Sequence, residues 1–271
     1  MFREDAEKRI YPVCKSATSL PPVVVNILFR TLSNGLAPAE DPRRIWRATA
    51  IMTSMVPTTS EVLDATEHLP YGATLVLPEV SWDDYELLLD ELAERHLRVT
   101  YDCGTLEIMS PLADHEDYAR FIDALVIECC DASNLEVESR GSTTWKRRVL
   151  GKGAEGDSCY YIRNARQIIG KRKIDLESDP PPDIVVEIDT TSKSLKKFSI
   201  FAALSVPEVW RYDGKNVQIY ELKNGKYVKT ASSQILPRLT GAILSEFIEM
   251  MKTQGNTAAR HAFRRRIAAS L

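Results

Sequence analysis

Acidic residues recur along one short apolar segment, Pro181 to Asp189, which reads PPDIVVEID. In a strand, Asp183, Glu187 and Asp189 would share one face, because successive side chains alternate. An unpaired buried carboxylate costs several kcal/mol or becomes protonated. A divalent cation would resolve that conflict. The alternative is that Asp183 caps a turn and Asp189 ends the strand in solvent, so that Glu187 pairs with a nearby lysine.

Two further residues extend this pattern. Asp157 opens an otherwise apolar and aromatic segment, although an acid there could equally mark the boundary between a loop and a strand. Lys197 lies on an apolar helical stripe whose other members are Ile200, Phe201 and Leu204. It should therefore face a sheet, where a lysine must either snorkel out or meet carboxylates. The pattern predicts a site that contains Asp157, Glu187 and Lys197.

The cysteines and histidines do not indicate a zinc site. The five cysteines include no Cys-x-x-Cys pair, and the four histidines show no i,i+4 spacing. Any metal in this protein is therefore expected to be a hard cation held by oxygen atoms.

The elements that must position these residues mix helices and strands. Helices are expected after the capping residues Thr58, Ser81 and Asp114, and at about residues 194–204. Strands are expected at 99–101, 106–108, 137–145, 157–162, 184–188, 209–212 and 217–222, with a turn at Asn224-Gly225 leading into 227–228. This order predicts an α/β or α+β fold with a mixed sheet flanked by helices.

Composition limits the domain organisation. The 271 residues carry a net charge of −3, and no apolar run approaches the length of about 18 to 20 residues that a membrane span needs. We expect an N-terminal extension at 1–50, one domain at 51–250 and a basic tail or amphipathic helix at 251–271. The start has no apolar signal core, so a cytoplasmic protein without a membrane partner is expected.

The order Asp157, Glu187 thirty positions later, then Lys197 resembles the PD-(D/E)-x-K nuclease superfamily, which has the restriction endonuclease-like fold. The closer resemblance is to its Uma-type family of restriction endonuclease-like proteins. It extends from about Met55 to Phe263. The segments that carry it are Gly104 to Pro111 with His115, Pro182 to Ile188, and Lys197 through Val206 to Tyr212.

Two positions depart from the family pattern. Gly156 precedes Asp157 where the family has a proline, which keeps the carboxylate but loosens the backbone before it. The superfamily places a lysine two residues after the glutamate, where this chain has Asp189. Lys197 on the following helix would then have to supply the amine, which resembles what the Uma-type family shows.

The resemblance implies a metal-dependent endonuclease that hydrolyses phosphodiester bonds in DNA. Asp157 and Glu187, with the main-chain carbonyl of Ile188, would bind Mg²⁺, or Mn²⁺ in its place, and the metal would activate a water molecule. Lys197 would orient that water or stabilise the transition state.

Three more residues are considered for this site. Asp183 and Asp189 are expected to support the ligands or to replace one of them. His115 matches a family position, but a single histidine near a helix start is as often structural, so no role is assigned to it.

A basic stretch supports a polyanionic partner. Residues 140–173 contain ten basic and two acidic side chains. The residues expected to contact nucleic acid are Lys146, Arg147, Arg148, Lys171, Arg172 and Lys173, with Trp145, Tyr160 and Tyr161 available for stacking. The alternative is a solvated loop whose charge is balanced by the acidic helix after Ser81. DNA is the expected partner, RNA is left open, and a homodimer is compatible with double-strand cutting.

Two other functional hypotheses fit the same residues. The first is a nuclease-fold module that binds nucleic acid but no longer cuts it, with Gly156 and the displaced lysine as signs of decay. The second is an interaction protein in which Glu187 and Lys197 form a buried ion pair.

Overall fold

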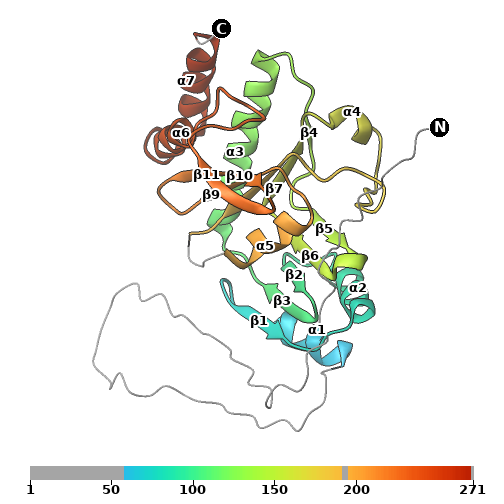
Figure 1. Cartoon of the computed structure of the whole chain (residues 1–271). Coiled ribbons are helices and arrows are strands. Elements are labelled where there is room, and N and C mark those ends of the chain that lie inside the picture. The colour runs from blue at the N-terminus through green and yellow to red at the C-terminus, as the bar shows by residue number, and fades with distance from the viewer. Residues whose placement is uncertain (1–57, 191–194, 270–271) are drawn as a thin grey trace, which may run out of the picture.

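The structure, a computed structural model, describes residues 58–190 and 195–269 (Figure 1). The expected extension at 1–50 lies outside these residues. The helices are α1 (Thr59–Glu67), α2 (Trp82–Glu91), α3 (Ala113–Ala132), α4 (Ala165–Ile168), α5 (Leu195–Ala203), α6 (Gly241–Gln254) and α7 (Asn256–Ala268). The strands are β1 (Thr74–Leu77), β2 (Arg98–Asp102), β3 (Thr105–Met109), β4 (Glu138–Ser139), β5 (Thr144–Arg147), β6 (Lys152–Glu155), β7 (Ser158–Tyr161), β8 (Ile184–Ile188), β9 (Glu208–Tyr212), β10 (Val217–Lys223) and β11 (Lys226–Thr230).

The strands form two sheets. The first sheet, which we call sheet A, has the order β1-β3-β2-β6-β5 and is antiparallel throughout. The second, sheet B, has the order β11-β10-β9-β8-β7-β4. In sheet B the pair β8 and β9 is parallel and the other pairs are antiparallel. The expected mixed sheet flanked by helices is therefore confirmed, and it is consistent with the restriction endonuclease-like fold.

Helices cover both faces of sheet B. Alternate residues of β8 enter two different cores, because Ile184, Val186 and Ile188 pack with α3, α6 and α7, whereas Val185 packs with α5. The α5 core also includes Trp145 and Ala154 of sheet A. Figure 1 shows α5 in orange where the two sheets meet. The predicted alternation along this strand is confirmed.

Sheet A has one apolar and one polar face. Its apolar face packs against α1 and α2 through residues such as Tyr85, Leu88, Val99 and Leu106. Arg98 and Thr100 belong to the opposite face of β2, because side chains alternate along a strand. At these two positions the polar face is also buried, since Arg98 is 9% and Thr100 is 7% exposed.

Local capping signals account for the first two helices. The side chains of Thr58 and Glu61 form the predicted capping box at α1, and the hydroxyl of Ser81 accepts a hydrogen bond from the Asp84 amide at α2. The prediction that Asp114 caps the third helix was wrong. Helix α3 begins at Ala113, and its N-cap is Leu112, whose side chain makes no capping bond.

The strand expected at 137–145 is divided. The structure places β4 in sheet B and β5 in sheet A, with Arg140 in the break between them. The Arg140 amide still donates to the carbonyl of Cys159 in β7, and its guanidinium group donates to the carbonyls of Ile168 and Lys171, so this residue also holds the loop that follows α4. The sequence analysis did not predict β1 or β6.

The C-terminal basic segment forms a helix. Ala259, Phe263 and Ile267 of α7 are buried in the core that also contains Phe247 of α6. Of the two forms left open for 251–271, the described residues therefore show the helix. No helix in the described part of the chain is both long and apolar enough to cross a membrane.

Candidate functional site

The chain passes from sheet A to sheet B at Gly156, and the predicted site residues meet at this junction. Asp157 lies between β6 and β7, Glu187 lies on β8, and Lys197 lies on α5. The Lys197 ammonium group lies 3.0 Å from Oε2 and 3.3 Å from Oε1 of Glu187. It also donates to the main-chain carbonyl of Glu155 at 2.8 Å. A single lysine of α5 thus contacts both a carboxylate of sheet B and the end of β6.

The strand register places Asp157 beside the end of β8. Its amide donates to the carbonyl of Val186 at 2.9 Å, and its carboxylate Oδ2 accepts from the amide of Ile188 at 2.7 Å. Asp157 and Glu187 are 7% and 1% exposed. These backbone bonds fix the Asp157 carboxylate at the strand end, so it remains placed whether or not a cation is bound.

Gly156 is required by close packing at the junction. A Cβ atom on Gly156 would lie 2.5 Å from Cγ1 of Val185, which is too close for two carbons. The glycine that stands where the family has a proline therefore allows β8 to approach the loop before Asp157.

We expect Gly156→Ala to lower the free energy of unfolding by about 1–3 kcal/mol, because the added methyl group overpacks the contact with Val185. Val185→Ala in the same protein should relieve the clash, so the double variant should be less destabilised than the sum of the two single changes. Urea denaturation of the four proteins measures this coupling. Additive losses would show that the clash is relieved elsewhere.

Two residues that the sequence analysis did not assign to the site complete the cluster. Nη1 of Arg98 lies 3.0 Å from Oε1 of Glu155, and its Nε lies 3.4 Å from Oδ1 of Asp157. Glu155 could have been considered, because it precedes Asp157 by two positions. Arg98 gave no comparable signal, since nothing local shows that the polar face of β2 is buried against the junction.

The two additional aspartates have different positions. Asp183 lies before β8, at the other end of the strand from Glu187, and its carboxylate accepts hydrogen bonds from the amides of Ile162 and Asn164. The structure therefore does not bring Asp183 to the cluster. Asp189 directly follows β8 and forms an ion pair with Arg211, whose Nη2 lies 2.7 Å from Oδ2. Asp189 remains near the cluster, but it is engaged by its own arginine.

Burial and an excess of carboxylates determine the electrostatics of the cluster. Burial raises the pKa of Glu187 to about 8, with a further upward contribution from Asp157 and Asp189 that the nearby Lys197 opposes. Burial also raises the pKa of Glu155, against the effect of Arg98 and Lys197. Burial would lower the pKa of Lys197, but the carboxylates of Glu187 and Asp157 outweigh it and the pKa is raised. The cluster therefore binds a proton readily, and a cation could replace that proton.

This shift predicts how stability depends on pH. Between the ordinary pKa of a glutamate, about 4.5, and the raised value of about 8, the folded protein holds a proton on Glu187 that the unfolded chain has lost. The free energy of unfolding should therefore fall as the pH rises through this window, by up to about 1.4 kcal/mol per pH unit for one proton. Glu187→Gln should flatten that slope, as measured by urea denaturation in chelator at several pH values. An equal slope in both proteins would contradict the raised pKa.

The donor atoms in the cluster suit a hard cation, because Glu155, Asp157 and Glu187 offer carboxylate oxygens. As they stand, however, Asp157 and Glu187 are paired with Arg98 and Lys197. No group of three or more His, Cys, Asp or Glu side chains in the described residues is arranged to hold a metal ion. The chemistry of the site fits a divalent cation, which would have to take the place of these ion pairs.

The predicted nucleic-acid contacts are divided between ion pairs and exposed positions. Lys146 and Arg148 pair with Glu86 of α2 at 2.8 Å, and Lys171 pairs with Asp179. Arg147 donates to the carbonyl of Leu176. Arg172 and Lys173 are exposed in the loop after α4. The acids that balance Lys146 and Arg148 lie on the helix after Ser81. For these two residues the alternative interpretation, in which this helix balances the charge of the basic stretch, is confirmed.

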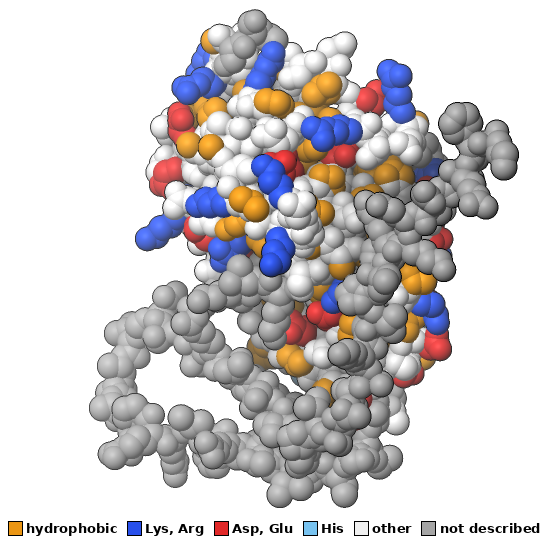
Figure 2. Space-filling model, viewed as in Figure 1, with side chains coloured by type: hydrophobic (Ala, Val, Ile, Leu, Met, Phe, Trp, Pro, Cys, Tyr) orange, Lys and Arg blue, Asp and Glu red, His pale blue; other side chains and the backbone are white. Residues whose placement is uncertain are grey.

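The prediction that aromatic side chains are available for stacking on bases was wrong. Trp145 is 1% exposed, and Tyr160 and Tyr161 are fully buried, so these rings cannot stack on bases. Trp145 instead packs edge-on against Tyr161, with ring centroids 5.8 Å apart. The rings of Trp145 and Tyr161 pack in the core between the two sheets. Figure 2 shows that Lys and Arg side chains on the visible face are spread among acidic and apolar ones.

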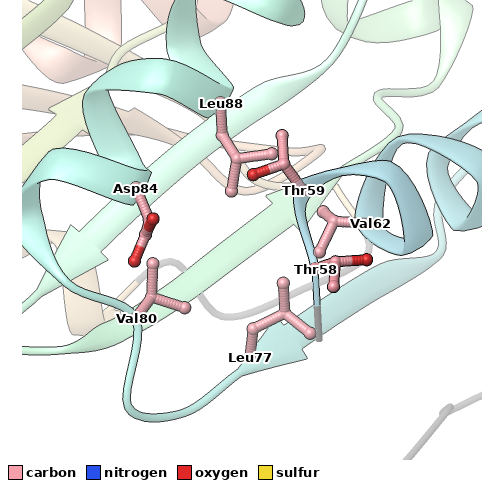
Figure 3. A pocket seen from close by; sticks show the side chains of 7 residues that line it. All are labelled: Thr58, Thr59, Val62, Leu77, Val80, Asp84 and Leu88. Carbon is pink, nitrogen blue, oxygen red and sulfur yellow. The ribbon is translucent and has the colours of Figure 1, made fainter. Parts of the chain in front are cut away.

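A cavity of about 370 Å³ lies away from the cluster, between α1, α2 and the end of β1. Its lining is formed by Thr58, Thr59, Val62, Leu77, Val80, Asp84 and Leu88 (Figure 3). Val62, Leu77, Val80 and Leu88 belong to the core that packs on the apolar face of sheet A, opposite Arg98. With one carboxylate and no base among its lining residues, this cavity has no evident chemistry.

The fold and the cluster of carboxylates with a lysine are those expected of a restriction endonuclease-like protein. The family model Uma2, described as "Putative restriction endonuclease", matches residues 82–252, and the chain belongs to this family. The match runs from α2 to β11 and includes most of α6, so it contains every residue of the cluster. A search of curated proteins gives no match.

Proposed function

We propose that this protein is a metal-dependent endonuclease that hydrolyses phosphodiester bonds in DNA. The observation that carries the proposal is the convergence of Asp157, Glu187 and Lys197 from three separate segments of the chain, with the Lys197 ammonium group 3.0 Å from Glu187. The Uma2 family of the chain supports the same activity. Family membership alone would not identify the site, because one fold can serve many functions.

The residues of the cluster would divide the work as follows. Asp157 and Glu187 would hold Mg²⁺ or Mn²⁺, which supplies an activated water molecule and neutralises charge on the phosphate. Lys197 would place a fixed positive charge beside the phosphate oxygens and stabilise the negative charge that develops there. In the reaction, the water oxygen forms the new bond to phosphorus and the bond to the leaving sugar oxygen breaks. The proton lost by the water passes to solvent, and the leaving oxygen takes a proton from solvent.

Cleavage of supercoiled plasmid tests this proposal. With Mg²⁺ or Mn²⁺, the wild-type protein should nick the plasmid, and Glu187→Ala purified in the same way should not, because the variant loses one of two ligands. Chelator should abolish the wild-type activity. Equal cleavage by both proteins would show that a contaminant or another site is responsible.

The runner-up is a module that binds nucleic acid without cutting it. The observation that favours it is that both proposed ligands are already engaged by Arg98 and Lys197. Calorimetric titration with Mg²⁺ separates the two functions. Binding by the wild type that is lost in Asp157→Ala supports the endonuclease, whereas DNA binding without Mg²⁺ binding or cleavage supports the module.

A further inference from the structure

His115 is a buried residue in the first turn of α3, and its two ring nitrogens have different surroundings. Nε2 lies 3.2 Å from Oγ1 of Thr190. Nδ1 is buried as well, but it has no hydrogen-bond partner among the residues that the structure describes. The residue is 4% exposed. A buried polar atom without a partner costs about 1–3 kcal/mol, so a functional reason for it should be sought.

The surroundings of His115 are those of the candidate site. Thr190, which contacts Nε2, follows Asp189 at the end of β8. The charges of Asp157, Lys197, Arg98 and Asp189 all act on the imidazole. The histidine therefore belongs to the same junction of the two sheets, although it comes from a fourth element.

A neutral imidazole at this place has one donor and one acceptor nitrogen. Burial lowers the pKa of His115, against the effect of Asp157, which favours the neutral ring at neutral pH. If the Nε2 hydrogen is donated to Thr190, Nδ1 is left as an acceptor. The threonine contact thus fixes the orientation of the ring, and with the hydrogen on Nε2 it leaves Nδ1 as the acceptor.

We propose that His115 is a further residue of the hydrolytic site, and that its Nδ1 accepts a hydrogen bond from the water that attacks phosphorus. The inference rests on the proposed function, because it assigns a partner to an atom within that site. His115 holds the water in line and does not need to take its proton. Thr190 acts as a positioning residue through Nε2.

Two amide variants separate the roles of the two nitrogens. An asparagine amide reaches about as far as Nδ1, whereas a glutamine amide reaches about as far as Nε2. His115→Asn should therefore keep most plasmid-cleaving activity, and His115→Gln should lose roughly 100-fold in kcat with little change in KM. Both should retain the wild-type melting temperature within a few degrees. Retention of activity by the glutamine variant, or equal activities of the two variants, would overturn the assignment to Nδ1.

The tautomer gives a readout that does not depend on activity. A long-range ¹H–¹⁵N NMR spectrum of the metal-free protein should show the His115 ring protonated on Nε2, and His115→Asn identifies the signal among the four histidines. A ring protonated on Nδ1 would overturn the proposal. If the wild type shows no cleavage that depends on Glu187, the proposed function fails and this role of His115 fails with it. If the wild type cuts and the variants behave otherwise than expected, only the role of His115 fails.

Discussion

Lys197→Met should lower the free energy of unfolding by about 3–5 kcal/mol at about pH 9 and should abolish cleavage. Lys197 forms a buried ion pair with Glu187, and removing one partner of such a pair leaves the other charge uncompensated. The loss of stability should be smaller at about pH 6, because Glu187, with a pKa of about 8, then carries a proton and needs no cation. The cleavage defect should persist at both pH values.

The double variant Lys197→Met, Glu187→Gln tests this explanation. It removes the charge of both partners, so most of the stability lost at about pH 9 should return while cleavage remains absent. Lys226→Met is the matched control, because Lys226 is exposed on β11 and its loss should change stability by less than about 0.5 kcal/mol. Thermal and urea denaturation at the two pH values measure all four proteins. A Lys197→Met protein as stable as the wild type at about pH 9 would contradict the ion pair.

Glu208→Ala should lower the free energy of unfolding by a similar amount, about 3–5 kcal/mol. The Glu208 side chain is 1% exposed and accepts hydrogen bonds from the Trp210 indole, the Ser233 hydroxyl and the amides of Gln234 and Ile235. Truncation leaves these donors without an acceptor in a place that water does not reach readily. The expected result is a large fall in melting temperature.

Trp210→Phe is the control for Glu208. It removes one of the four donors and keeps most of the buried ring, so its cost should stay near 1–2 kcal/mol. If Glu208→Ala lowered the free energy of unfolding no more than Trp210→Phe, the hydrogen bonds from Gln234 and Ile235 to Glu208 would not be what stabilises this loop. The expected difference between them would make Glu208, which lies in one of the segments that resemble the family, a structural residue.

The sequence predicted best the features that depend on local pattern. The alternation along β8, the caps of α1 and α2 and the stripe that turns Lys197 inward were all correct, because each follows from the geometry of one element. The division of 137–145 between two sheets was not predicted. At that break the Arg140 guanidinium group binds carbonyls about 30 residues away in the chain, a contact that the local pattern does not indicate.

Burial against distant elements explains what was missed in the site. Arg98 was not singled out from the sequence, because its partners Glu155 and Asp157 lie 57 and 59 positions further along. The stacking role predicted for the aromatic residues was wrong for the same reason. A strand rich in tyrosine beside basic residues could be a stacking surface or a core strand, and the packing of sheet A against sheet B decides for the core.

The junction of the two sheets also bears on how the protein folds. Its contacts join residues far apart in sequence, with separations of 59 positions for Arg98 and Asp157, 42 for Lys197 and Glu155, and 75 for His115 and Thr190. Contacts of this kind form late, because the entropy of closing long loops must be overcome before they contribute. The antiparallel pairs β2–β3 and β5–β6 of sheet A and β9–β10 and β10–β11 of sheet B join strands that are consecutive in the chain and can form early. The parallel pair of β8 and β9, by contrast, requires the crossover through α5. Refolding chains should therefore acquire much of their secondary structure before the carboxylates, the lysine and the histidine come together.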